Sequence, residues 1–211
     1  MRYRTFVSMK IALIGTGEVA EAYAMRYAMA GHEVLMAWKE ENIGISPSLA
    51  ELENVYVCSI EKAAALADLI IIATAPVHVR EVAYWLGDVR RKVIIDATSN
   101  IHINTEDQVN TYFAIKAITG SPHIVKVFST RGYEQLLKPI FKHDSIQLIM
   151  SGDSRKAKEI VKILTIDMGT KIFFDMGNSD TIPLFNEMTS GWRKLALAWD
   201  KTVIAINPIR I

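Results

Sequence analysis

Apolar runs alternate with helical patterns along the whole chain. The run at residues 11–14 is unbroken, as a strand buried on both faces of a parallel sheet requires. After it, small residues recur every four positions at Ala20, Ala24 and Ala28, which is the spacing of one helix face. This helix is followed by a glycine and then by the next apolar run, at residues 33–37. The pattern therefore predicts a βαβ unit at the start of the chain.

The same alternation continues beyond this unit. Residues 43–54 are rich in loop formers and predict a loop with a short helix, and Asp180 is expected to cap a last helix that has Pro183 in its first turn. Further strands are expected at residues 55–57, 69–73, 92–96, 124–128, 145–150 and 171–174. Further helices are expected at residues 60–67, 77–86, 105–119 and 155–168. This order predicts an α/β fold with a doubly wound, mostly parallel sheet and a small α/β C-terminal part.

Composition and charge exclude several classes of protein. The 211 residues, half of them hydrophobic, suffice for one large core or for one domain with a small appendage. The 24 basic and 23 acidic residues nearly cancel and form no long basic run, so nucleic acid is not an expected partner. No apolar run is long enough to cross a bilayer, so no membrane partner is expected. The single cysteine, Cys58, lies in an apolar stretch and is expected to be a core residue. A single cysteine cannot form a disulfide within the chain, so a cytoplasmic protein is expected.

A glycine-rich turn links the first strand to the first helix. The pattern G-x-G-x-x-G/A is fitted by Gly15, Thr16, Gly17, Glu18, Val19 and Ala20. The first glycine of this pattern makes a tight turn, the second lets the backbone approach a pyrophosphate, and the third small residue lets helix and strand pack closely. Free amides at the start of the helix then face the phosphates. We expect a dinucleotide in a Rossmann-type domain; the alternative is a glycine turn that serves packing alone.

The domain boundaries follow from this motif. Residues 1–8 are expected to be an N-terminal extension, residues 9–130 the NAD(P)-binding Rossmann domain, and residues 131–211 a small region for substrate binding or dimerisation. The apolar residues near the end of the chain are expected to be buried against the domain or in a homodimer formed through the C-terminal helix.

The end of the second strand is where the adenosine ribose is normally recognised. A carboxylate there holds the 2′-hydroxyl of NAD, whereas a basic residue accommodates the 2′-phosphate of NADP. This strand ends in Trp38 and Lys39, which favours NADP. The alternative is a solvated Lys39 with Glu40 or Glu41 turned inward, which would suit NAD. Trp38 could cover the adenine, although a tryptophan at such a position is more often a core residue.

Small polar residues follow the later strands of the predicted sheet. In an open parallel sheet the carboxyl ends of the strands border the ligand crevice, so these residues are candidates for contacts with the cofactor or the substrate. The cofactor candidates are Thr74, Ala75, Pro76, Ala97, Thr98 and Ser99. The substrate candidates are Asn100, Ser129 and Thr130. Ordinary turn chemistry is the competing explanation for the same residue types.

Four stretches, in their order and spacing, resemble the family of the NADPH-dependent deazaflavin (coenzyme F-420) reductases and their dinucleotide-binding relatives. They are residues 14–17 (Ile-Gly-Thr-Gly), 95–98 (Ile-Asp-Ala-Thr), 126–130 (Lys-Val-Phe-Ser-Thr) with Gly132, and 175–177 (Asp-Met-Gly). The resemblance implies hydride exchange between NADP(H) and a flavin-like ring that lies over the nicotinamide. It also implies that residues 15–19 bind the pyrophosphate, that Lys39 binds the 2′-phosphate, and that Thr74, Pro76, Ala97 and Thr98 lie beside the cofactor.

The chain departs from the pattern of that family at several positions. Lys39 is followed by Glu40 where the family commonly has a second basic residue, which weakens the expected preference for NADP. Ser129 replaces a frequent asparagine, Arg131 enlarges the following loop, and Asn178-Ser179 replace Pro-Leu. These last changes are expected on the substrate side of the site.

Hydride transfer between two rings needs binding and alignment rather than a protein nucleophile. The sequence agrees, because it offers no metal-ligand cluster and no paired catalytic carboxylates, and it identifies no catalytic residue. Three functions stay open: an NADP(H)-dependent flavin or deazaflavin oxidoreductase, a small imine or hydroxy-acid reductase, and a dinucleotide-binding sensor without turnover.

Overall fold

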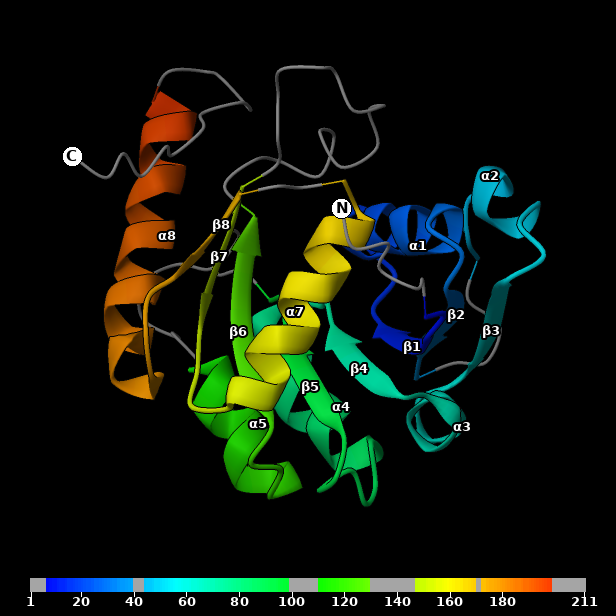
Figure 1. Ribbon diagram of the computed structural model, residues 1–211, viewed down its shortest axis with the longest axis horizontal. Helices are drawn as coiled ribbons and strands as arrows, with labels where there is room; N and C mark the ends of the chain where they lie inside the picture. Colours follow the sequence, from blue (N-terminus) through cyan, green and yellow to red (C-terminus); the bar gives the residue numbers. More distant parts are fainter. Residues whose placement is uncertain (1–6, 40–43, 99–109, 130–146, 170–171, 199–211) are drawn as a thin grey trace, which may run out of the picture.

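The computed structural model describes residues 7–39, 44–98, 110–129, 147–169 and 172–198, and these form one layered α/β unit (Figure 1). Its strands are β1 (Lys10–Ile14), β2 (Glu33–Trp38), β3 (Val55–Ser59), β4 (Leu69–Ile72), β5 (Val93–Asp96), β6 (Ile124–Ser129), β7 (Gln147–Ser151) and β8 (Ile172–Asp175). They form an eight-stranded sheet in the order β3-β2-β1-β4-β5-β6-β7-β8. The first six strands are parallel, β7 runs antiparallel to β6, and β8 runs parallel to β7.

Helices cover both faces of the sheet. The helical segments are α1 (Glu18–Met29), α2 (Pro47–Ala50), α3 (Ile60–Leu66), η1 (Pro76–His78), α4 (Val79–Trp85), α5 (Thr111–Thr119), α7 (Arg155–Asp167), η2 (Ser179–Thr181) and α8 (Ile182–Ala198). Alternate side chains of the central strands pack against α1 and α7 on one face and against α3, α4 and α5 on the other. The last helix, α8, packs through Phe185 against Phe128 of β6.

The predicted fold class is confirmed, and the expected strands match the observed ones to within a few residues. The unbroken apolar runs at β1, β4 and β5 are buried because helices cover both faces of these strands. Cys58 is buried, as expected of a core residue. One expectation is wrong in detail: Asp180 lies inside η2, which Asn178 precedes, and does not cap α8. The division at residue 130 stays a prediction, and β7 and β8 continue the sheet of the first six strands.

The exits of β1 and β4 approach each other at Gly15. This glycine has a φ of +144°, and a Cβ atom built on it would lie 2.3 Å from the carbonyl oxygen of Ala73. The Ala73 amide donates to the Ile14 carbonyl (2.8 Å), and the Gly15 amide donates to the Ala37 carbonyl (3.1 Å). A side chain at position 15 would push these strand ends apart, so the glycine is a requirement of the fold itself.

The reversal of β7 places residues 175–179 at the edge of the sheet opposite to this turn. Gly152, directly after β7, has its Cβ position 2.7 Å from the carbonyl oxygen of Ile124, at the amino end of β6. Its amide donates to the Gly177 carbonyl (3.1 Å), and the Ser179 amide donates to Asp153 (2.8 Å). The expectation that Asn178 and Ser179 fall on the substrate side is therefore wrong, because the glycine turn lies at the carboxyl ends of the parallel strands.

The two glycines of the first turn should differ in how much an added methyl group changes the stability of the fold. Gly15→Ala should lower the free energy of unfolding by at least about 2 kcal/mol, because the residue would be both clashed and strained. Gly17→Ala should change it by less than about 1 kcal/mol, because the backbone there is extended and no atom lies within 4 Å of its Cβ position. Urea unfolding of the two variants measures both values, and equal stabilities would contradict this account.

The contacts of Asp153 predict an acid-sensitive contribution to stability. The hydrogen bond from the Ser179 amide, helped by Lys116, holds the pKa of this carboxyl at about 2, against an ordinary 3.8. A carboxyl with a lower pKa in the folded state stabilises the fold at pH values above its pKa in the unfolded state. This stabilisation is lost as the pH falls through the pKa of the folded state. Asp153→Asn should therefore be less stable than the wild type at neutral pH, and the difference should shrink between about pH 4 and pH 2. Urea unfolding across this range measures it, and a constant difference would refute the assignment.

Candidate functional site

The amino terminus of α1 forms the first part of the site. Gly17 precedes the helix in an extended conformation and, having no side chain, offers no acceptor at the N-cap position to the amides of the first turn. Residues 16–19 are exposed, whereas Ala20 is buried and lies beside Gly15. The Cβ position of Gly17 faces open space. An uncapped helix start beside a residue without a side chain has the geometry of a phosphate site.

The exits of the central strands lie abreast at this edge. The Ala73 amide donates to Ile14 (2.8 Å), and the Ala97 amide donates to Ile72 (2.9 Å), so the exits of β1, β4 and β5 are tied to one another. Thr74 and Ala97 are half-buried, Ala75 is exposed, and the buried Pro76 begins η1. The structure thus brings these predicted cofactor residues to the same edge as the glycine turn. Ser129, at the end of the parallel strand β6, is half-buried.

Trp38 and Lys39 contact the segment that follows β4. Trp38 is half-buried and packs against the apolar cluster beneath α3 and α4, and its ring meets His78 edge-on at 5.5 Å between centroids. The Lys39 ammonium lies 5.8 Å from the centroid of the Trp38 ring and forms an ion pair with Glu81 of α4. Glu81 could not be predicted as a neighbour of Lys39 from the sequence, because only the tertiary fold brings α4 to the end of β2. Glu40 and Glu41 lie outside the described residues.

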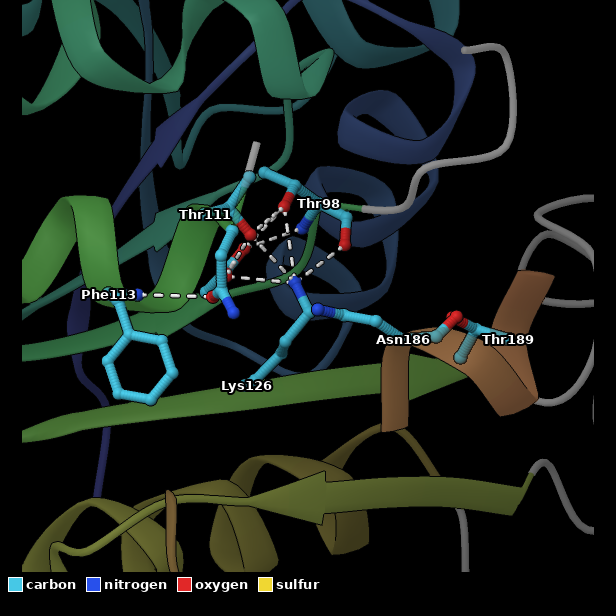
Figure 2. A network of polar contacts seen from close by, with 8 residues as sticks. Thr98, Thr111, Phe113, Lys126, Asn186 and Thr189 are labelled. Atoms are coloured by element: carbon cyan, nitrogen blue, oxygen red, sulfur yellow. Dashed lines mark hydrogen bonds and ion pairs between the residues drawn. The ribbon is translucent and has the colours of Figure 1, made fainter. Parts of the chain in front are cut away.

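A buried polar network lies under the exit of β5 (Figure 2). Asp96 ends β5 and faces Lys126 of β6 in register, and their side chains are 0% and 5% exposed. Lys126 Nζ lies 2.9 Å from Asp96 Oδ2, and it also donates to the hydroxyl of Thr111 (2.9 Å) and to the carbonyl of Thr98 (3.2 Å). Every proton of the ammonium therefore has an acceptor within reach, which a buried lysine requires.

Two threonines complete this network. The hydroxyl of Thr98 donates to Asp96 Oδ1 (2.6 Å), and its amide donates to the same oxygen (3.0 Å). Thr111, at the start of α5, donates to Asp96 Oδ2 (2.6 Å). Thr98 is 3% exposed, so its side chain fixes the exit of β5 from below and is not an exposed donor. In Figure 2, Asn186 of α8 points toward the Lys126 side of the network.

Asp96 and Lys126 were not among the site residues predicted from the sequence. A signal was present, because each interrupts an apolar run that was expected to be a buried strand. A buried charge at such a position needs a partner, and successive strands of a sheet are often neighbours. Ser99, Asn100 and Thr130 lie outside the described residues, as does Arg131.

Other kinds of site find no support in the described part of the chain. Its histidines, cysteine and carboxylates form no group of three that could hold a metal ion. None of its helices combines the length and apolarity needed to span a bilayer.

Comparison with known proteins agrees with this geometry. A sequence model of the family described as NADP oxidoreductase, coenzyme F420-dependent, matches residues 10–100, which run from β1 past the exit of β5. The resemblance predicted from the sequence is confirmed over these residues. The predicted class of function, an NADP-dependent oxidoreductase, is that of the matching family.

Solved structures share the fold at low sequence identity. A proposed F420-dependent NADP reductase from Arthrobacter sp. FB24 is 21% identical with a TM-score of 0.80, and the match covers 96% of this chain and all of that one. An imine reductase from Myxococcus stipitatus is 15% identical with a TM-score of 0.66, covering 92% of this chain and 60% of that one. The pyrroline carboxylate reductase of Plasmodium falciparum, solved with NADP, is 14% identical with a TM-score of 0.63, covering 90% and 66%.

The buried network predicts a large loss of stability when its cation is removed. Lys126→Met leaves the Asp96 carboxylate buried without its cationic partner, so the free energy of unfolding should fall by about 3–5 kcal/mol. The double variant Asp96→Asn/Lys126→Met removes both charges and should recover part of that loss. Urea unfolding of the two single variants and the double variant measures the coupling. Additive losses, or a Lys126→Met variant as stable as the wild type, would contradict the pairing.

Proposed function

We propose that this chain is an NADP(H)-dependent oxidoreductase that transfers a hydride between the nicotinamide and a flavin-like or deazaflavin-like acceptor. The observation that carries the proposal is the glycine turn: Gly17 leaves open space at the uncapped start of α1, beside the exits of β1 and β4. In the sheet order, β1 and β4 are the neighbours between which the chain switches direction. Open α/β sheets bind nucleotides at this point.

The described residues would hold the dinucleotide along the carboxyl edge of the sheet. The amides at positions 18 and 19 would bind the pyrophosphate, as an anion is bound at a helix start. Trp38 and Lys39 would take the adenosine end. Thr74, Ala75 and Pro76 would follow the middle of the cofactor, and Ala97 and Thr98 would border the nicotinamide. This fit rests on backbone donors and open space, which the geometry of the turn supplies.

When bound, a reduced nicotinamide supplies a hydride, which is two electrons and one proton, to the acceptor. The chain contributes alignment. Asp96 holds the Thr98 amide (3.0 Å) and Lys126 holds the Thr98 carbonyl (3.2 Å), so the peptide groups at the exit of β5 have fixed directions. Asp96, Thr98 and Lys126 are therefore positioning residues, because their side chains are buried beneath the surface that would face the ring. Fixed donors and acceptors cost no reorganisation when the rings meet.

The acceptor and the quaternary state are further parts of this proposal. Asn100, Ser129 and Thr130 would donate hydrogen bonds to the second ring. Residues 131–211 would complete the substrate region and form a homodimer through the C-terminal helix, on which Leu184 and Leu195 are exposed in the described part. The predicted location of the protein is the cytoplasm.

Reduction of a small imine or keto acid is the second candidate. The likeness of the fold to an imine reductase favours it. The chain spans 60% of that structure. A sensor that binds dinucleotide without turnover is the third candidate, because the positions expected at the acceptor depart from the family pattern.

Steady-state assays with NADPH separate the three candidates. Purified protein is mixed with NADPH and a panel of flavins, deazaflavins, cyclic imines and keto acids, and the loss of nicotinamide absorbance is followed. We expect turnover with a flavin-like or deazaflavin-like acceptor. Turnover only with an imine or keto acid would favour the second candidate, and saturable binding without turnover would favour the sensor.

Gly17→Asp is the matched test of the cradle. Its carboxylate would occupy the open space at the start of α1 and repel a diphosphate, so affinity for NADPH should fall at least about tenfold, while the far-ultraviolet dichroism stays that of the wild type. Calorimetric titration measures the affinity. Wild-type protein that binds neither NADPH nor NADH, or a folded Gly17→Asp protein that binds as the wild type does, would overturn the proposal.

A further inference from the structure

We propose that Glu81 reduces the preference for NADPH over NADH by competing with the 2′-phosphate for Lys39. This inference rests on the proposed function, because it assumes that a dinucleotide binds with its ribose at the end of β2. It assigns a specificity role to α4, which carries no part of the glycine motif.

The contact itself is the first observation. Lys39 Nζ and Glu81 Oε2 form an ion pair between side chains that are 29% and 45% exposed. The Lys39 ammonium also lies 5.8 Å from the centroid of the Trp38 ring. The lysine is thus held between an aromatic ring and a carboxylate. A 2′-phosphate that approached it would meet the negative charge of Glu81 beside the cation it needs.

Glu81 lies in the first turn of α4, so its ion pair joins this helix to the end of β2. The same segment contributes His78, whose ring meets Trp38 edge-on. Two contacts, Lys39 with Glu81 and Trp38 with His78, therefore join the end of β2 to the segment after β4. These are the two segments that would border the adenosine end of the cofactor.

The two nucleotides differ in what they demand of this ion pair. The 2′-phosphate of NADPH needs the ammonium as its own partner, so Glu81 must give up its contact or remain as a repelling neighbour. The 2′-hydroxyl of NADH makes no such demand, and the pair can stay intact. Glu81 therefore reduces the difference in affinity between NADPH and NADH that Lys39 alone would produce.

Binding of both nucleotides to charge-neutral variants tests the inference. Glu81→Gln should tighten NADPH about three- to fivefold and change the affinity for NADH less than about twofold. Lys39→Gln should weaken NADPH about tenfold and leave NADH nearly unchanged. In the double variant the Glu81→Gln effect on NADPH should be smaller than in the Glu81→Gln single variant, because the competition for Lys39 is absent there. Calorimetric titration measures all the affinities.

Glu159→Gln is the matched control. Glu159 pairs with Lys162 on α7 (2.8 Å), and their side chains are 56% and 30% exposed. The Glu159→Gln variant therefore loses a similar ion pair on another helix. It should leave the ratio of the two affinities unchanged. A Glu81→Gln protein with the wild-type ratio would overturn the inference, as would one that binds both nucleotides equally more tightly or loses affinity for NADH. Failure of the wild type to bind either nucleotide would instead overturn the proposed function.

Discussion

The exits of β1 and β4 lie so close together that only a glycine fits between them. At Gly15 a Cβ atom would lie 2.3 Å from the Ala73 carbonyl oxygen, far inside van der Waals contact. This contact turns the chain sharply out of the sheet, and α1 then begins directly over the edge where the parallel strands end. Two residues later, Gly17 precedes the helix without a side-chain cap and has open space at its Cβ position. A steric limit inside the fold therefore creates the space that a ligand would use.

Much of the fold could be predicted because its signals are local. An unbroken apolar run such as that of β4 fits a strand covered on both faces, and the alanine spacing of α1 fits a helix packed closely on the sheet. The direction of β7 left no such signal, because an apolar run reads the same in a parallel and an antiparallel strand. The misplacement of Asn178 and Ser179 follows from this single missing fact, since the reversal sends the exits of β7 and β8 to the opposite edge.

The candidate site was predictable to the same extent. The glycine turn is contained in a few consecutive residues, so sequence spacing alone could locate it. The Lys39–Glu81 pair joins residues from β2 and α4, and neither residue is unusual in its own segment. The Asp96–Lys126 pair is an intermediate case. Each charge interrupts an apolar run, and their register across β5 and β6 becomes visible only when the sheet is assembled.

The chemistry of the Asp96–Lys126 pair argues for a role in geometry. Removing both ions from water costs several kcal/mol each, of order 10 kcal/mol together, and apolar residues at the same positions are often at least as stable. Stability alone therefore gives little reason for two inward-facing charges in adjacent parallel strands. The pair instead orients the Thr98 peptide groups through Asp96 Oδ1 and Lys126 Nζ, which apolar side chains cannot do. Beyond packing, this buried charge pair therefore fixes the orientation of the Thr98 peptide groups at the exit of β5.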